Sequence, residues 1–357
     1  MTTRATGAHT PPAPAPAPVS YDPELAPGLA AFLDLVEHIP LRADTILANR
    51  RHFATIIPPI EAQVAGRAVE WENRMIPGPI GAPDVELTII RPLDGTRHGT
   101  QDGARHGARS LAAGVLGIHG GGQVLGTRFF GTPELIELAV DYGMVGVAVE
   151  YRLSPEHPGT AAAEDCYAAL CWLAANADEL GVDRDRLIVS GASAGGGLSA
   201  AVALLARDRH GPALAGQLLN CPMIDDRNDT VSSLQYDGIG AWDRNNNDTA
   251  WTAILGADRF TDAVSPYAAP ARAGDLSALP PAYIEVGSAE VFRDEDIDYA
   301  RRIWAAGGVA ELHVWSGAYH GFSGFSPDAN VSRAAIAARD SWLRRTLGVT
   351  PRPTPAP

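Results

Sequence analysis

The chain has 357 residues, 46% of them hydrophobic and 20% charged, which is enough to bury a sizeable core in one large domain. Its 42 acidic residues outnumber its 28 basic ones, and the charge of −14 argues against nucleic acid or an anionic membrane as a partner. The first residues contain no apolar signal core, and no uncharged apolar run approaches the ~20 residues that span a bilayer. We therefore expect a cytoplasmic protein that acts on small molecules.

Both ends of the chain have compositions typical of disorder. Residues 1–20 are rich in Pro, Ala and Thr, and residues 349–357 in Pro and Thr, so we expect two disordered tails. Between residues 21 and 65, apolar residues recur at helical spacing and predict two amphipathic helices ahead of the first strand. These helices must cover another part of the fold.

The middle of the chain alternates between strand and helix patterns. Residues 69–76 and 85–90 predict an antiparallel pair at a sheet edge, and the apolar-poor segment 94–110 predicts an exposed insertion. From Leu111 onward, short apolar runs alternate with helical patterns, which indicates a mostly parallel α/β sheet. The expected strands are residues 115–118, 144–149, 187–190, 214–219, 283–286 and 312–315, and the expected helices are residues 133–142, 161–176, 197–207, 296–306 and 329–347.

One interval breaks this alternation. Residues 222–265 are polar and irregular, and they are too long for a plain connection. Long excursions from a compact domain are usually lids or inserted elements. We expect this insertion and the N-terminal helices of residues 21–65 to form a cap on a catalytic domain of residues 66–221 and 266–348.

The three cysteines predict neither a disulfide framework nor a metal site. Cys166 and Cys171 are five positions apart on an expected helix and do not share a face, and Cys221 lies near the end of an expected strand. Free cysteines commonly behave as small buried apolar residues. We expect no metal and no cofactor.

The apolar run of residues 187–190 ends on a Gly-x-Ser-x-Gly motif centred on Ser193. A serine on a tight turn from strand to helix is held in a strained conformation with its hydroxyl projecting, and the glycines Gly191 and Gly195 let neighbouring chain pass close to it. The same pattern also occurs in turns without chemistry. A nucleophilic serine further needs a base, an acid and an oxyanion hole.

A glycine-rich loop at residues 119–122 follows an expected strand and is the candidate oxyanion hole. Its glycines let backbone N–H groups turn toward a developing negative oxygen, so we expect the amides of Gly121, Gly122 and Ala194 to form the hole. The alternative is a phosphate cradle, but neither a Gly-x-Gly-x-x-Gly spacing nor a Gly-Lys-Ser/Thr ending is present there. We expect His119 to brace this loop rather than act as the base.

His320 is the candidate base, because it alone of the ten histidines lies on a loop between the last strand and the final helix. The chain order serine, acid, histidine then requires a carboxylate that follows a strand between Ser193 and His320. Glu290 satisfies this requirement. Asp294 is the alternative acid, although it also fits the acidic first turn of the next helix.

Together these motifs resemble the bacterial hormone-sensitive-lipase family of esterases, family IV of the α/β-hydrolase superfamily, over residues 23–347. The resemblance implies an eight-stranded, mostly parallel sheet flanked by helices, a helical cap, and hydrolysis of short- to medium-chain carboxylic esters through an acyl-enzyme on Ser193. Homodimers occur in similar proteins, and Arg152 and Glu156 are expected in structural ion pairs. The motifs are HGGG at 119–122, YRLSPEHP at 151–158, GASAGG at 191–196, EVFRDE at 290–295 and HGF at 320–322.

Three positions depart from the family pattern. Ala192 stands where the family often has Asp or Thr, Gln123 where an aromatic residue is usual, and Glu290 where many members carry Asp. None of these differences removes a chemical group that the mechanism needs, but Gln123 predicts a more polar pocket mouth.

The substrate and the pocket are less defined by the sequence. A lactonase, an amide hydrolase or a deacetylase acting on a small metabolite would use the same triad, and a non-catalytic ligand-binding member would have a damaged one. The candidate pocket residues are Gln123, Phe129, Phe130, Trp242, Tyr267, Phe292 and Phe322.

Overall fold

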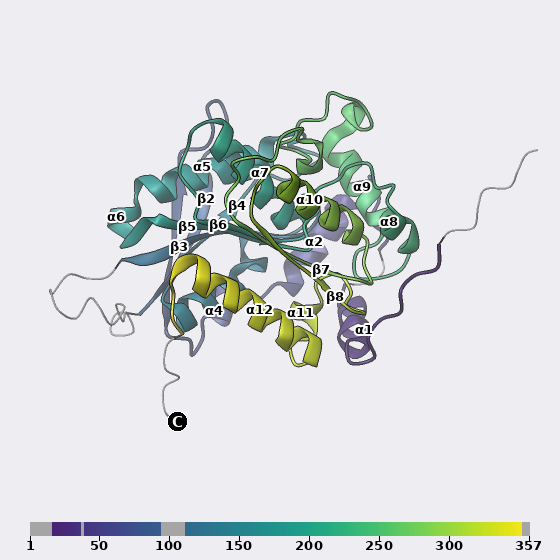
Figure 1. Ribbon diagram of the computed structural model, residues 1–357, viewed down its shortest axis with the longest axis horizontal. Coiled ribbons are helices and arrows are strands. Elements are labelled where there is room, and N and C mark those ends of the chain that lie inside the picture. Colours follow the sequence, from purple (N-terminus) through teal and green to yellow (C-terminus); the bar gives the residue numbers. More distant parts are fainter. Residues whose placement is uncertain (1–15, 37–38, 94–110, 352–357) are drawn as a thin grey trace, which may run out of the picture.

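One central sheet organises the computed structural model, which describes residues 16–36, 39–93 and 111–351 (Figure 1). Its eight strands follow the order β1-β2-β4-β3-β5-β6-β7-β8. β1 pairs antiparallel with β2 and β2 antiparallel with β4, whereas every other neighbouring pair is parallel, which confirms the predicted fold class. The strands are β1 (Val69–Ile76), β2 (Val85–Pro92), β3 (Ala112–Ile118), β4 (Val145–Glu150), β5 (Val182–Ala192), β6 (Gly216–Asn220), β7 (Ala282–Gly287) and β8 (Ala310–Trp315).

Helices cover both faces of the sheet (Figure 1). One face carries α5 (Ala161–Ala175), α7 (Ala194–Asp208) and α10 (Arg293–Ala305), and the other carries α4 (Thr132–Tyr142) and α12 (Asn330–Leu347). Residues of α4 and α12 pack with strand residues in one buried cluster, and residues of α5 and α7 pack in another. Because both faces are covered, the parallel strands β6 and β7 are buried along their whole length, as their mainly apolar sequences predicted.

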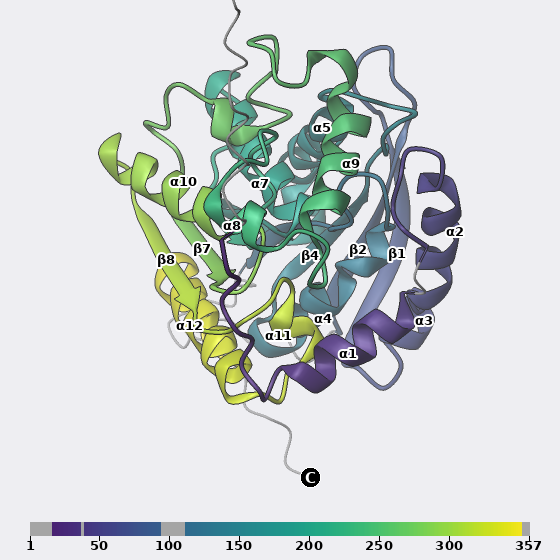
Figure 2. The same ribbon diagram turned by 90° about the vertical axis from the view of Figure 1, so that its right-hand side faces the viewer.

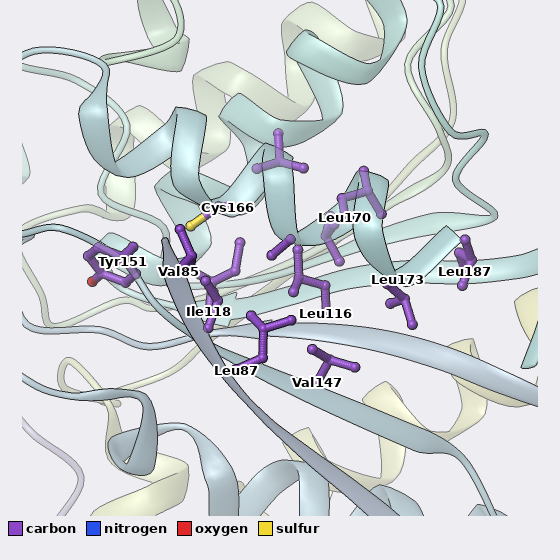
Figure 3. Close-up of a cluster of buried hydrophobic side chains, with 14 of the residues drawn as sticks. Val85, Leu87, Leu116, Ile118, Val147, Tyr151, Cys166, Leu170, Leu173 and Leu187 are labelled. Carbon is purple, nitrogen blue, oxygen red and sulfur yellow. The ribbon is translucent and has the colours of Figure 1, made fainter. Parts of the chain in front are cut away.

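The cluster under α5 illustrates the packing (Figure 3). Leu116 and Val147 project from β3 and β4 toward Leu170 and Leu173 of α5, and all four are fully buried. Burying an aliphatic side chain of this size contributes about 1.5–3 kcal/mol. This core fixes the strand ends from which the candidate site is built.

The N-terminal helices and the long insertion lie together at one end of the molecule (Figure 2). Apolar side chains of α2 (Ile46–Ile56) and of α9 (Arg244–Leu255) share one buried cluster, for example Phe53 and Trp251. α2 and the shorter α1 (Ala26–Leu35) are the two helices predicted before β1. The remaining short helices are α3 (Ile60–Gln63), α6 (Ala177–Leu180), α8 (Val231–Gln235) and α11 (Phe322–Phe325).

The expected tails differ in part from the structure. Residues 1–15 and 352–357 lie outside the described residues, as does the predicted insertion 94–110. Residues 16–20, however, contact α8: Gln235 Nε2 donates to the Ala17 carbonyl at 2.6 Å and the Tyr236 hydroxyl to the Val19 carbonyl at 2.8 Å. Val349 is buried against α12. Residue composition could not predict these contacts, because they are made by backbone carbonyls and by a single apolar side chain.

No helix within residues 16–36, 39–93 and 111–351 is long and apolar enough to cross a membrane.

Candidate active site

Ser193 occupies the turn between β5 and α7, with φ 59° and ψ −124°. This positive φ is strained for a residue with a side chain, and hydrogen bonds hold it: Ser193 N donates to the Asn220 carbonyl, and Met223 N donates to the Ser193 carbonyl, both at 2.9 Å. A Cβ at Gly195 would lie 2.0 Å from the Ile118 carbonyl oxygen, so only glycine fits there. The strained turn predicted from the Gly-x-Ser-x-Gly motif is therefore present.

Glu290 and His320 form a close pair beside this turn. Glu290 follows β7, and its Oε1 accepts a hydrogen bond from Gly287 N at 2.7 Å. Its Oε2 lies 2.6 Å from Nδ1 of His320, which follows β8. A carboxylate can only accept, so Nδ1 carries the proton and Nε2 is left as a proton acceptor. Both side chains are buried, which strengthens the interaction.

The alternative acid faces elsewhere. Asp294 Oδ2 accepts from Ser232 N at 2.8 Å, and Oδ1 accepts from Arg293 Nε at 2.7 Å. These contacts tie the first turn of α10 to α8 rather than to His320. The structure thus brings Glu290, and not Asp294, to the histidine.

The glycine-rich loop adopts conformations that require glycine. Gly121 has φ 112° and Gly122 has φ 63°. Ala194 is the first residue of α7, where amide N–H groups have no acceptor within the helix. The structure therefore has the backbone conformations and the free helix terminus that an oxyanion hole needs.

His119 braces this loop, as expected. Its ring stacks on Tyr151 with centroids 4.1 Å apart, and Nδ1 lies 2.8 Å from the Gly120 carbonyl oxygen. The Tyr151 hydroxyl donates to the His119 carbonyl at 2.8 Å. Burial lowers the pKa of His119, which favours a neutral ring.

A cavity of about 820 Å³ opens over Ser193 and His320. Gly120 and Gly121 of the glycine-rich loop also line it. Its walls come mainly from the N-terminal helices and from the insertion. The large apolar side chains in the wall are Phe32, Leu33, Val36, Ile39, Leu41, Phe53, Leu125, Phe130, Trp242 and Phe325.

Of the seven predicted pocket residues, only Phe130 and Trp242 line this cavity. Phe129 instead lies 4.4 Å from the Arg128 guanidinium and packs with the cluster of α4 and α12. The Tyr267 hydroxyl donates to Asp208 at 2.9 Å, away from the site.

The other three predicted pocket residues that do not line the cavity are buried. Gln123 is enclosed in the loop at φ 57°, where its carbonyl accepts from Ser154 N, so it does not form the expected polar mouth. Phe292 stands edge-on to the His320 ring, with centroids 5.1 Å apart, and does not line the cavity. Phe322 packs with Leu25. These three side chains pack around the site and do not line the cavity.

The prediction missed the walls contributed by α1 and α2. Phe32 and Val36 of the α1 region and Phe53 of α2 are among them. The apolar face of these helices was visible in the sequence, and it was the signal that could have identified the wall. The sequence does not show, however, which part of the fold this apolar face covers, because that depends on tertiary packing.

The ion pairs expected in the segment 151–158 are present. Arg152 pairs with the fully buried Asp165 at 2.8 Å. Glu156 pairs at 2.8 Å with Arg50 of α2, whose guanidinium also donates to the Ser154 carbonyl. The second pair ties an N-terminal helix to the sheet domain.

Cys221 is buried, as expected, but it also lines the cavity. Its sulfur, a carboxylate oxygen of Glu290 and a ring nitrogen of His320 all lie within 4.8 Å of one another. This proximity was not predicted from the sequence, which places the three residues far apart.

Known proteins resemble the chain closely. Residues 115–324 match a family described as alpha/beta hydrolase fold. Carboxylesterase NlhH of Mycobacterium tuberculosis is 38% identical over 65% of this chain and 73% of that protein. Ethyl acetate hydrolase of Pseudomonas putida is 30% identical over 84% of this chain and 92% of that protein. The solved structure titled bacterial heroin esterase matches with a TM-score of 0.79 at 34% identity, over 92% of this chain and 98% of that one.

Proposed function

The chain belongs to the alpha/beta hydrolase fold family and is a carboxylic ester hydrolase, and we propose that it works through an acyl-enzyme on Ser193. The observation that carries the proposal is the 2.6 Å hydrogen bond between Glu290 and His320, whose ring faces the same cavity as Ser193. This arrangement matches the earlier resemblance to hormone-sensitive-lipase-like esterases.

In the first half of the reaction, Nε2 of His320 takes the proton of Ser193, and the serine oxygen attacks the ester carbonyl carbon. The amides of Gly121, Gly122 and Ala194 stabilise the oxyanion of the tetrahedral intermediate. Glu290 holds the imidazole in the required tautomer and stabilises the imidazolium. His320 then gives its proton to the departing alcohol.

In the second half, water replaces the alcohol. His320 takes a proton from this water, which attacks the acyl-enzyme, and a second tetrahedral intermediate collapses to release the carboxylic acid and Ser193. No step in this sequence of proton transfers uses a group other than those of the chain, the ester and water.

We propose short- to medium-chain esters as substrates. A cavity of about 820 Å³ with these apolar side chains in its wall suits a small acyl group and its alcohol. The relative named ethyl acetate hydrolase supports the short end of this range. Residues 21–65 and 222–265 would act as the cap that sets acyl length, and the shared buried cluster of Phe53 and Trp251 supports that role.

Dimerisation stays a prediction. β8 is an edge strand of the sheet; Val314 on it is 41% exposed and Val309 just before it is 64% exposed, so a surface for a second copy is available there. Light scattering of the purified protein tests it: a monomer at micromolar concentration would contradict the prediction.

The test of the mechanism is Ser193→Ala, assayed with p-nitrophenyl esters of graded acyl length. We expect a loss of kcat that approaches roughly 10⁶-fold, by analogy with serine proteases. Ser190→Ala is the matched control, because Ser190 Oγ donates to Glu134 at 3.3 Å and does not line the cavity. Unchanged turnover by Ser193→Ala would refute the mechanism. Including lactones and acetylated small molecules distinguishes a lactonase or a deacetylase.

A further inference from the structure

We propose that Cys221, Glu290 and His320 form a binding site for a thiophilic divalent cation such as Zn²⁺, and that the bound ion inhibits the esterase. The inference rests on the proposed function, because Glu290 and His320 are its acid and base. One ligand atom from each residue lies within 4.8 Å of the other two, and all three residues are buried. Cys221 and His320 line the cavity, so a small ion can reach the site from there.

The fold brings the three ligands together at the carboxyl ends of adjacent strands. Cys221 follows β6, Glu290 follows β7 and His320 follows β8, and these strands are parallel neighbours. Cys221 has φ 38°, and its N–H donates to the Glu285 carbonyl at 2.6 Å. This strained and anchored backbone fixes where the thiol lies.

The electrostatic surroundings favour a cation. Cys221 is buried, and its sulfur lies within 4.8 Å of a carboxylate oxygen of Glu290. Asp296 is fully buried, and neither of its oxygens has a hydrogen-bond partner among the described residues. Because burial raises the pKa of Asp296, Glu290 is the carboxylate that attracts a divalent ion here, and an ion that binds offsets the charge of the thiolate.

The ligand set suits Zn²⁺. Thiolate sulfur binds this ion at about 2.3 Å, and imidazole nitrogen and carboxylate oxygen bind it at roughly 2.0–2.2 Å. Tetrahedral ligands are then roughly 3.3–3.7 Å apart. The 2.6 Å separation between His320 Nδ1 and Glu290 Oε2 must widen by about 1 Å, and the sulfur must approach by a similar amount. Water from the cavity can supply the fourth ligand.

Binding would move two protons. The ion takes the place of the proton between Nδ1 of His320 and Glu290, and that proton moves to Nε2, which leaves the imidazole neutral. The thiol proton of Cys221 is released to solvent as the metal–sulfur bond forms. A protonated Nε2 cannot accept the proton of Ser193, so turnover stops.

The experiment uses Co²⁺ as a spectroscopic probe and Zn²⁺ as the inhibitor on the full chain. We expect one Co²⁺ per chain, a near-ultraviolet thiolate-to-cobalt charge-transfer band, and release of one proton measured by calorimetry in buffers of different ionisation enthalpy. Cys221→Ala should remove the band and raise the Zn²⁺ concentration for half-inhibition by at least about 100-fold, because losing even an outer partner of a ligand costs 10–100-fold. Each variant is compared with its own metal-free rate.

Two further variants keep the test decisive. Cys171→Ala is the matched control, since this half-exposed thiol lies on α5, away from the cavity, and both the band and the inhibition should persist. Cys221→Ser retains the side-chain size if the alanine variant does not fold, and it should also lose the band.

The outcomes separate this inference from the proposed function. A band or half-inhibition unchanged in the folded Cys221 variants would overturn the metal site. Ser193→Ala should still bind Co²⁺ with the band. If Ser193→Ala retained esterase turnover while the band persisted in the wild type, the mechanism would fail and the metal site would stand.

Discussion

Replacing Glu290 by glutamine tests the acid of the proposed triad with a nearly isosteric change. In the wild type, one carboxylate oxygen accepts from Gly287 N at 2.7 Å and the other faces His320 Nδ1 at 2.6 Å. In Glu290→Gln the amide oxygen is the group that can accept from Gly287 N. The amide NH₂ then faces Nδ1, so Nδ1 must accept and the imidazole proton moves to Nε2.

The tautomer change sets the expected size of the effect. A histidine protonated on Nε2 cannot take the Ser193 proton, and the imidazolium also loses its buried counter-charge. The corresponding acid-to-amide change in a serine protease triad lowers kcat by about 10⁴-fold. We expect a similar loss here, which corresponds to roughly 5.5 kcal/mol of transition-state stabilisation at about 1.4 kcal/mol per tenfold.

The assay is kcat and KM for p-nitrophenyl acetate, with thermal unfolding to confirm that the variant is folded. Asp294→Asn is the matched control, because Asp294 contacts Ser232 and Arg293 and does not contact His320. Its kcat should stay within about tenfold of the wild type, as expected for a group outside the reacting centre. A Glu290→Gln variant that keeps its rate while Asp294→Asn loses it would refute the assignment of the acid.

Three other changes have defined outcomes. Phe53→Ala opens the cavity wall, so kcat/KM for longer acyl chains should rise relative to acetate by about fourfold for each extra methylene that the enlarged cavity buries. Leu47→Ala, on the exposed side of α2, is the control and should leave this ratio unchanged. Burial and the neighbouring Glu295 raise the pKa of Asp296, so the folded state binds more protons than the unfolded chain and loses stability as pH rises. In urea unfolding between about pH 5 and about pH 8, the free energy of unfolding of Asp296→Asn should therefore increase relative to that of the wild type as pH rises. A difference that stays constant with pH would contradict the raised pKa. Arg152→Ala leaves the carboxylate of the fully buried Asp165 unpaired and should lower the free energy of unfolding by roughly 3 kcal/mol, measured by urea titration; a loss below about 1 kcal/mol would contradict the pairing.

The sequence predicted the sheet more accurately than it predicted helix and strand ends. Short, mainly apolar runs identified the buried strands, because both faces of a parallel sheet are covered. The helix expected from residue 197 begins at Ala194, so the structure extends it over Gly195 and Gly196. Their close contacts with the Ile118 carbonyl and with Pro222 explain why glycine occurs inside this helix.

The candidate catalytic residues could be predicted because their chemistry depends on local order. Ser193, Glu290 and His320 each follow a strand, and parallel strands bring their carboxyl ends to one edge of the sheet. No comparable rule predicts from sequence which side chains line a pocket. Phe129 and Phe130 are adjacent in sequence, yet only the second lines the cavity, because consecutive side chains of a turn point in different directions.

By itself, therefore, the amino-acid sequence was enough to predict the fold class and the chain order of the candidate catalytic residues, since apolar periodicity and glycine positions are properties of neighbouring residues. Only the tertiary structure placed Glu290 rather than Asp294 beside His320, made α1 and α2 cavity walls, and brought Cys221 near His320. These contacts join residues that are distant along the chain, so they depend on how the layers pack and leave no periodic signal in the sequence.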